Sequence, residues 1–414
     1  MKNILILCDA LPPSFAPRMG YLCKYLPSLG WKPIVITEYN SQKYYKNITE
    51  NENVTCINFF HNKKNNVSKL KYLFVFIADY LFDYKEVIIK NRAKKLLKNN
   101  NISIILSSNS FRTCFAKAAM ELAVKHQIPF VLDIRDIFEQ FPNDEYASRL
   151  LIKSNAINDF VTKHIKKHFL KQRNSILPKA NTITTVSEWH RDFLKKFNPN
   201  VQLIYNGFDP DLFNYQKVNA EKFKITYVGR IESLDIKNPT LLFEAVKILA
   251  DKKLIEKDKF RLEFYLINET SKEIIKTLSQ KFDVEEFITI FGTVQNIQVP
   301  EILNNSSILL LLANKATENK SPKGILGTKL FEYMAVEKPI LCVRNDESFI
   351  EEIINKSNSG VAASNVEQSA EFILSKLNEW QTQGFTHQTI NKDFIRQFSR
   401  KTQAEQFAKI LSEM

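Results

Sequence analysis

The sequence is poor in glycine, with nine residues in 414, and it contains neither a G-x-G-x-x-G nor a G-x-x-x-x-G-K-[ST] segment. These segments cradle the phosphates of dinucleotides and nucleoside triphosphates. Their absence counts against a dinucleotide-dependent dehydrogenase and a P-loop enzyme. The sequence also lacks an apolar run of about eighteen residues, and its start, MKNILILCDA, has no cleavable small-residue site. We therefore expect a cytoplasmic protein without a membrane-spanning helix.

Cysteine and histidine are scarce and scattered. The five cysteines and six histidines form no constellation with metal-ligand spacing, and Cys8 and Cys342 lie within apolar, strand-like runs. We expect reduced cysteines packed in the core, no essential metal and no bound cofactor.

Acidic residues are scarce in the first half of the chain. Residues 1–205 contain 31 Lys and Arg against 16 Asp and Glu, a net charge of +15, whereas residues 206–414 contain 27 against 29, a net charge of −2. An anionic membrane surface or an anionic acceptor at the first half would account for this split. The basic residues are not interleaved with aromatic residues along a stripe, so we expect no nucleic-acid partner.

Short β-branched runs alternate with helix-forming stretches along the chain, which indicates parallel sheets flanked by helices. In the first half these runs are ILILC, PIVIT, ISIIL, PFVLD and TITTV. After the turn-rich YNGFDPDLF the pattern restarts with KITYVG and continues with LEFYLI, FITIFG, SILLLLA and PILCV. We therefore predict two α/β domains, over 1–206 and 207–392, and a final helix over 393–414 that could pack back on the first domain.

The segment 70–97 allows two interpretations. Its apolar residues recur at close to helical spacing, and Lys and Arg crowd residues 85–98. One interpretation is an ordinary helix with a buried face. The other is an interfacial helix that lies on a membrane, with Phe74, Phe76 and Tyr80 on its apolar side and the following cations against lipid head groups.

The segment GILGTKLFEYMAVEKP, residues 324–339, is the most informative for chemistry. It follows the apolar run SILLLLA across a polar loop, and the turn at Gly327 and Thr328 opens a helix that carries Lys329 and Glu332. Free backbone N–H groups and the helix dipole at such a turn favour an anion, for which phosphate is suitable. A carboxylate one turn inside the helix requires another partner, and ribose hydroxyls fit the short reach of Glu332.

A second cluster, YVGRIESLDIKNP, directly follows the first strand of the second domain. Strand ends in open α/β sheets bind ligands, and Arg230 and Lys237 place two cations there. Such cations stabilise a departing diphosphate more than they stabilise the bound donor.

These residues carry a resemblance to the family-four group of retaining glycosyltransferases. That group has the GT-B fold, an α/β architecture of two Rossmann-like domains whose parallel sheets face a central cleft. The resemblance covers essentially the whole chain and rests on the order and spacing of four stretches. They are PPSFAPRMGYLCKYLPSLGWKPIVIT, NTITTVSEWHRDFLKKF followed by VQLIYNGFDPDLF, YVGRIESLDIKN, and GTKLFEYMAVEKPIL.

The resemblance assigns donor roles in the second domain. It implies that Arg230 and Lys237 grip the donor diphosphate, and that the helix opened by Gly327, Thr328 and Lys329 contacts phosphate. It also implies that Glu332 holds the ribose. The family commonly has another glutamate eight residues before the ribose-binding one, and this sequence has Gly324 there, which leaves the donor sugar open.

The first domain departs from the family at its first loop. Many relatives have a glycine pair where this chain has Phe15 and Ala16, with Arg18 and Gly20 following. We expect Arg18 and Gly20 to approach the donor phosphates.

The segment VLDIRDIFEQFP resembles an Arg–Asp–aromatic–Pro element of some family members. We predict that Asp136 orients or partly deprotonates the acceptor hydroxyl and that Arg135 sets its charge state. The alternative is a structural ion pair between these two residues at a strand end. Ser187 in TVSEWH precedes a predicted helix and reads as its N-cap.

The sequence thus predicts a glycosyltransferase that moves a sugar from a nucleoside-diphosphate-sugar donor to a glycan or lipid-linked acceptor. The resemblance implies retention of anomeric configuration and a role in cell-surface polysaccharide synthesis. The basic first half points to a peripheral position on the inner face of the plasma membrane. A nucleotide-sugar epimerase of similar fold and a catalytically silent sugar- or lipid-binding scaffold are the alternatives.

Overall fold

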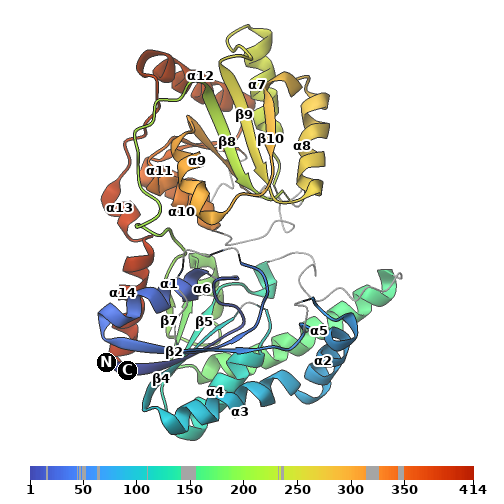
Figure 1. Ribbon diagram of the computed structural model, residues 1–414, viewed down its shortest axis with the longest axis vertical. Helices are drawn as coiled ribbons and strands as arrows, with labels where there is room; N and C mark the ends of the chain where they lie inside the picture. The colour runs from blue at the N-terminus through green and yellow to red at the C-terminus, as the bar shows by residue number, and fades with distance from the viewer. Residues whose placement is uncertain are drawn as a thin grey trace. The chain divides into compact units, whose positions relative to one another are not determined.

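The computed structural model describes residues 1–14, 17–43, 45, 48, 53–62, 66–109, 111–140, 155–231, 233–234, 237–313, 326–343 and 349–414. The chain divides into two compact units. The first contains residues 1–206 and Arg400–Met414, and the second contains the described part of residues 207–399. Each unit is built on its own parallel sheet (Figure 1).

The first sheet has seven strands in the order β3-β2-β1-β4-β5-β6-β7, and every neighbouring pair is parallel. The strands are β1 (Lys2–Cys8), β2 (Trp31–Glu38), β3 (Val54–Ile57), β4 (Ile102–Asn109), β5 (Phe130–Ile134), β6 (Thr182–Thr185) and β7 (Val201–Leu203). Helices α1 (Pro17–Tyr25), α2 (Lys69–Phe82), α3 (Tyr84–Asn99), α4 (Cys114–His126), α5 (Asn155–Ile176) and α6 (Glu188–Leu194) connect them.

Strand β1 shows why the first sheet is covered on both faces. Successive side chains of a strand point to opposite faces, and in β1 both sets are apolar. Leu5 and Leu7 join the core under α3 and α4, whereas Ile4 and Ile6 join the core under α1 and the last helix of the chain. Figure 1 shows these helices on the two sides of the sheet.

The helical stretch over residues 70–97 is two helices and not one. It breaks at Asp83, whose backbone adopts the left-handed conformation, φ 50° and ψ 38°. Asp83 ends α2 by donating its N–H to the carbonyl of Asp79, and its carboxylate accepts from Lys117 on α4. The break lets α3 turn to follow the sheet while α2 continues separately.

The second sheet has six parallel strands in the order β10-β9-β8-β11-β12-β13. They are β8 (Phe223–Gly229), β9 (Phe260–Leu266), β10 (Ile288–Phe291), β11 (Ile308–Leu312), β12 (Ile340–Val343) and β13 (Gly360–Ala363). The helices of this unit are α7 (Thr240–Asp251), α8 (Glu269–Lys281), α9 (Val299–Asn304), α10 (Thr328–Ala335), α11 (Phe349–Ser357), α12 (Val366–Gln383) and α13 (Lys392–Arg396). One core cluster joins β8, β9 and β11 to α7, α8 and α12.

The end of the chain forms two helices where the sequence predicted one. A turn at 397–399 separates α13 from α14 (Arg400–Ser412). Helix α14 belongs to the first unit, where Phe407 and Leu411 pack against α1 in the same core as β1.

The structure confirms the predicted fold class of two parallel sheets with flanking helices. The ten strands predicted from β-branched runs are present, and the strands β3, β7 and β13 were missed. Ser187 is confirmed as the N-cap of α6, where its hydroxyl accepts from the N–H of His190. None of the five cysteines forms a disulfide bond, and only Cys56 is exposed.

Candidate functional site

The direction of strand addition reverses at the boundary between β8 and β11 in the second sheet. From β8 the chain adds β9 and β10 on one side, and then β11, β12 and β13 on the other. Loops at the carboxyl ends of the two strands therefore diverge, and ligands of open α/β sheets bind at this position. Arg230 directly follows β8, and α10 is the first helix after β11 among the described residues. Both predicted donor clusters thus meet at one edge of the sheet.

Two lysines converge on the turn after β8. The hydroxyl of Tyr227 donates to the carbonyl oxygen of Arg230 at 2.8 Å, and Nζ of Lys237 donates to the same oxygen at 3.2 Å. Nζ of Lys329, from α10, donates to the Tyr227 hydroxyl at 3.2 Å and lies 4.4 Å from the centre of its ring. One phenol and one carbonyl therefore hold two ammonium groups close together.

Gly229 makes this approach sterically allowed. Its φ of +148° lies in the region that residues with a side chain rarely adopt. A Cβ at this position would lie only 1.9 Å from Nζ of Lys329. The residue must therefore be glycine for Lys329 to reach Tyr227.

Helix α10 presents its N-terminus at the same edge. Gly327 is its N-cap, is exposed, and has no described atom within 4 Å of where a Cβ would be. Thr328 and Lys329 form the first turn, and Glu332 follows one turn later with its side chain partly exposed. Free N–H groups and the helix dipole add to the positive potential of the lysines. The combination suits a phosphate or diphosphate.

The predicted donor residues form two groups in the structure. Arg230, Lys237 and Lys329 share the turn after β8 through the contacts above, whereas Gly327, Thr328 and Glu332 share α10. Sequence reasoning missed Tyr227, which links the two groups. Its alternation with the buried residues Phe223 and Ile225, two positions before Gly229, was the available signal.

The structure corrects the expectation for Arg18. Its side chain is only 3% exposed, and its guanidinium donates to both carboxylate oxygens of Asp133 and to the carbonyl of Tyr205. Asp133 in turn accepts from the hydroxyls of Ser108 and Thr184. Because these groups already satisfy the guanidinium, Arg18 ties α1 to β5 and has little surface for a donor phosphate.

Gly20 also has a packing role. A Cβ at this position in α1 would lie 2.4 Å from Cγ of Pro12. Glycine therefore lets α1 approach the loop after β1, which does not need a phosphate as explanation. The calls on Phe15, Ala16 and Gly324 fall outside the described residues.

Arg135 and Asp136 follow β5 at the carboxyl edge of the first sheet. Arg135 forms its ion pair with Asp9, at 3.1 Å, and so links the ends of β5 and β1. The alternative of an ion pair between Arg135 and Asp136 is therefore not the pairing found. Asp136 is partly exposed, and its Oδ1 accepts from Nε2 of Gln140 at 3.1 Å.

A buried chain of hydrogen bonds ends at Asp136. Gln140 donates through its amide nitrogen, so its Oε1 must accept, and Nε2 of His190 lies 2.6 Å from that oxygen. His190 therefore carries its proton on Nε2, and its Nδ1 accepts from the hydroxyl of Ser187 at 3.0 Å. The direction of every bond runs from Ser187 through His190 and Gln140 to the carboxylate.

Burial lowers the pKa of His190 from 6.5 to about 4. The imidazole is therefore neutral near pH 7, which is the state that the chain requires. The sequence placed His190 in a helix without a role, since no local pattern connects it to Gln140 fifty residues earlier.

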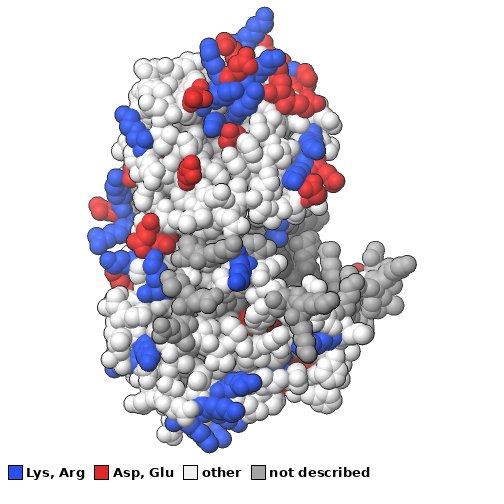
Figure 2. Space-filling model, viewed as in Figure 1, with Lys and Arg blue, Asp and Glu red and all other residues white. Residues whose placement is uncertain are grey.

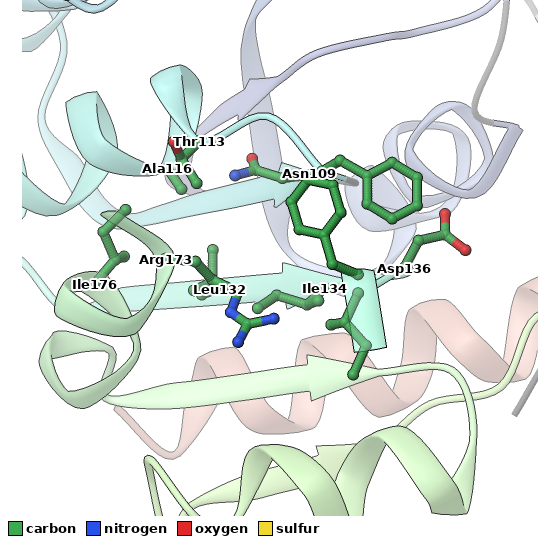
Figure 3. A pocket seen from close by; sticks show the side chains of 11 residues that line it. Asn109, Thr113, Ala116, Leu132, Ile134, Asp136, Arg173 and Ile176 are labelled. Atoms are coloured by element: carbon green, nitrogen blue, oxygen red, sulfur yellow. The ribbon is translucent and has the colours of Figure 1, made fainter. Parts of the chain in front are cut away.

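A small cavity lies behind Asp136 in the first unit (Figure 3). Its volume of about 20 Å³ is the room of roughly one water molecule. Figure 3 shows the carboxylate of Asp136 turned away from the aliphatic side chains of Leu132 and Ile176 that line the cavity. The cavity is too small for a sugar.

A larger groove of about 500 Å³ lies at the carboxyl ends of β1, β2 and β4. Asp9, Glu38, His61 and Arg112 give it polar walls, and Tyr72 from α2 closes one side. His61 is buried, and its Nδ1 has no hydrogen-bond partner among the described residues. A groove with mixed carboxylate, guanidinium and imidazole groups can hydrogen-bond a polyhydroxyl compound. Sequence reasoning did not find these groove residues because they come from four separate segments.

The described residues contain no group of three or more His, Cys, Asp or Glu placed to hold a metal ion. Within the same residues, every helix is too short or too polar to cross a lipid bilayer.

Two family models match consecutive parts of the chain. Residues 18–212 match the model described as Glycosyltransferase Family 4, and residues 209–391 match the model described as Glycosyl transferases group 1. No protein with a curated description matches the sequence.

Solved structures share the fold over the full length. Sucrose-phosphate synthase from Thermosynechococcus elongatus has a TM-score of 0.64 at 12% identity, with 100% of this chain and 99% of that chain covered. A glycosyltransferase from Rickettsia africae has a TM-score of 0.63 at 17% identity, covering 100% and 98%. HepE from Anabaena, in complex with UDP-glucose, has a TM-score of 0.60 at 13% identity, covering 100% of both chains. At these identities the similarity concerns the fold.

Proposed function

The matched family models identify the chain as a glycosyltransferase of the family 4 type with the GT-B fold, and from this premise we propose its substrates and chemistry. The enzyme transfers a sugar from a nucleoside-diphosphate-sugar donor to a glycan or lipid-linked acceptor with retention of anomeric configuration. The second unit binds the donor, and the first unit binds the acceptor.

The convergence of Lys237 and Lys329 at the N-terminus of α10 carries the proposal. A nucleoside diphosphate leaving the sugar gains negative charge in the transition state. Fixed ammonium groups and helix N–H groups stabilise that charge more than they stabilise the bound donor, which lowers the barrier. With this charge in place, a divalent metal is not required. Glu332, one turn inside α10, accepts hydrogen bonds from the ribose hydroxyls.

Asp136 acts on the acceptor side. Its carboxylate is partly exposed at the edge of the first sheet and is oriented by Gln140. In this position it orients the incoming hydroxyl or accepts its proton as the new bond forms. Gln140 and His190 serve as positioning residues.

A uridine-diphosphate hexose is the first donor to test, since the structurally similar HepE was solved with UDP-glucose. The acceptor is a lipid-linked or polysaccharide intermediate of the cell surface, and the enzyme acts at the cytoplasmic face of an anionic membrane. The net charge of +15 on residues 1–205 supports this location.

Donor consumption by the full chain tests the proposal. A panel of nucleoside-diphosphate sugars is first screened by thermal shift, because a ligand present at about 100 times its Kd stabilises the native state by about 2.7 kcal/mol. Release of nucleoside diphosphate is then measured with and without acceptor, in the presence of EDTA. We expect release that depends on acceptor and persists in EDTA. Conversion of the donor to an epimer without acceptor would establish the epimerase alternative instead, and binding without turnover would leave a scaffold.

A further inference from the structure

Helix α2 exposes an apolar stripe to solvent. Its outward side chains are spaced at i, i+3, i+4, i+7 and i+11, so they form one continuous face. They are Leu70, Leu73, Phe74, Ile77 and Leu81, and between 45% and 83% of each side chain is exposed. The outward face of a helix on a soluble domain is ordinarily polar. In α2 the outward face is apolar instead.

The opposite face of α2 is the one that packs on the first unit. Val75 is buried in its core, and Tyr72 and Phe76 are partly buried. This arrangement corrects one detail of the interfacial interpretation, since Phe76 and Tyr80 lie on the inward side and only Phe74 lies on the outward side. The helix therefore has an apolar face for the protein core and a second apolar face, the α2 stripe, for something else.

A stripe of cations lies on the helix next to α2. Helix α5 contacts α2 through His168 and Tyr80, whose ring centres are 4.8 Å apart. The exposed side chains of α5 at the same helical spacing are Phe160, Lys163, His164, Lys167 and Lys171. Asp159 is the only acidic residue of α5. Basic side chains also predominate in the part of the first unit that Figure 2 shows around α3.

The α2 stripe also borders a groove of about 610 Å³. Phe74, Val75 and Tyr84 supply its apolar wall, and the exposed cations Lys71 and Arg92 lie on the same lining. A phosphate-bearing head group fits between such cations while its acyl chains follow the apolar wall.

We propose that the α2 stripe inserts into the surface of an anionic lipid bilayer, with the lysines of α5 and the cations Lys71 and Arg92 held against lipid phosphates. An interfacial helix lies in the plane of the membrane with its apolar face about 5–10 Å deep and its flanking cations at the head groups. The inference extends the membrane location in the proposed function, and it does not depend on the chemistry of sugar transfer.

The positive charge of α5 favours a lipid bilayer, and not a second copy of the chain, as the partner of the α2 stripe. Two copies packed through α2 would bring the lysine stripes of both α5 helices near each other, and like charges oppose such contact. An anionic membrane offers apolar depth and negative head groups together. A functional benefit follows, because Tyr72 on the inward face of α2 lines the groove at the carboxyl edge of the first sheet. A lipid-linked acceptor in that membrane would then present its sugar beside the groove.

Vesicle flotation of the full chain tests the inference. We expect binding to vesicles of 30% phosphatidylglycerol in phosphatidylcholine, weaker binding to phosphatidylcholine alone, and a decrease as salt is raised. The variant Leu73→Ser/Phe74→Ser/Ile77→Ser should bind at least about tenfold less because it removes most of the inserted apolar surface. Lys163→Gln/Lys167→Gln/Lys171→Gln should lose the preference for anionic vesicles.

A matched control comes from the second unit. Leu254, Ile267 and Ile297 have similar exposed fractions, 42%, 52% and 64%, and their triple serine variant should float like the wild type. Sugar transfer to a water-soluble acceptor should be unchanged in the α2 variant, so loss of vesicle binding and loss of activity are separate results. Ile77→Trp provides a second readout, since brominated lipid should quench the new tryptophan. Wild-type flotation of the α2 variant, or a dimer that the α2 variant converts to monomer, would overturn the inference.

Discussion

At the residue scale, Tyr227 organises the proposed donor site. Its hydroxyl donates to the carbonyl of Arg230 and accepts from Lys329, while its ring lies under the ammonium of Lys329. The oxygen of Arg230 also accepts from Lys237. These contacts hold both ammonium groups at the turn after β8, where a diphosphate would meet them.

We predict that Lys237→Ala or Lys329→Ala lowers affinity for UDP by about 1.5–3 kcal/mol, the usual value of a charge-assisted hydrogen bond. Tyr227→Phe should weaken binding less, because the ring remains and only the hydroxyl is lost. Isothermal calorimetry measures each change, and Lys257→Ala, an exposed lysine of the same unit, is the control. Wild-type affinity in both lysine variants would show that Arg230 and the helix N-terminus carry the phosphate charge without the lysines.

Glu332 should respond differently from the lysines. Glu332→Gln weakens recognition of ribose, so we expect its penalty to shrink with a deoxynucleoside diphosphate, whereas the lysine penalties persist. An equal penalty of Glu332→Gln for both ligands would remove Glu332 from ribose recognition.

Asp136 should affect turnover more than donor binding. We predict that Asp136→Asn lowers kcat by at least about 100-fold, the usual contribution of an acid–base group, while affinity for the donor is retained. Gln140→Leu should lower kcat less and shift its pH profile, since it frees the carboxylate without removing it. Steady-state kinetics at several pH values measures both, and a wild-type rate for Asp136→Asn would leave that residue a structural role.

At the scale of the elements, the end of a strand and the start of a helix shape the proposed donor site. Gly229 at the end of β8 and Gly327 at the start of α10 stand at the same edge of the second sheet, but they meet different surroundings. A side chain at Gly229 would collide with Lys329, whereas the described surroundings of Gly327 are open. Glycine is therefore required sterically at position 229, whereas position 327 has room for a side chain.

We predict that Gly229→Ala lowers affinity for UDP by about tenfold or more, because the new Cβ displaces Lys329 and the backbone is strained. Gly327→Ala should keep affinity within about threefold of wild type, because no described atom lies within 4 Å of the new Cβ and the backbone φ of −67° suits alanine. Its cost, about 1 kcal/mol of helix stability for the poorer N-cap, should appear in the melting temperature instead. Calorimetry alongside thermal melts distinguishes lost binding from lost folding. Equal affinity of the two variants would contradict the assigned contact.

The buried pair of Arg18 and Asp133 joins α1 to β5. We predict that Arg18→Ala destabilises the first unit by about 3–5 kcal/mol, because it leaves a carboxylate that is 0% exposed without its charge partner. Urea unfolding measures the loss, and Arg92→Ala at an exposed position serves as control. The double variant Arg18→Met/Asp133→Leu should recover much of the stability. No loss in Arg18→Ala would mean that Ser108 and Thr184 suffice for Asp133.

Each unit of the whole molecule carries its own core and its own ligand-binding edge. The first has the excess of positive charge and the apolar stripe, and the second has the converging lysines at β8 and β11. The unit with the excess of positive charge is therefore the one proposed to bind the acceptor, and the other unit is the one proposed to bind the donor. Stability of the first unit also depends on pH through His190.

The folded pKa of His190, about 4, lies below its ordinary value of 6.5. As the pH falls, the unfolded chain therefore binds this proton first. The contribution of His190 to the free energy of unfolding is constant above about pH 6.5 and is lost between about pH 6.5 and pH 4. His190→Gln should flatten that part of the curve, whereas His126→Gln at an exposed position should not. Urea unfolding at stepped pH provides the measurement, and an unchanged slope in His190→Gln would assign the pH dependence to other groups.

The sequence by itself determined the two sheets, most of their strands and the helix that opens at Gly327. These features are local, because alternation along a strand and spacing along a helix record burial within a few residues. It also placed Arg230 and Lys237 after the first strand of the second domain and Glu332 inside the helix that opens at Gly327, and the donor roles of these residues stay predictions.

Only the tertiary structure decided the contacts between distant segments. Arg18 meets Asp133 across 115 positions, Tyr227 meets Lys329 across 102, and His190 meets Gln140 across 50. Strand order sets these meetings, and the order β3-β2-β1-β4 cannot be read from any single strand. The outward direction of the α2 stripe was undecided for the same reason. The spacing of its apolar residues predicts a helix, but only packing decides which of its two apolar faces the protein covers.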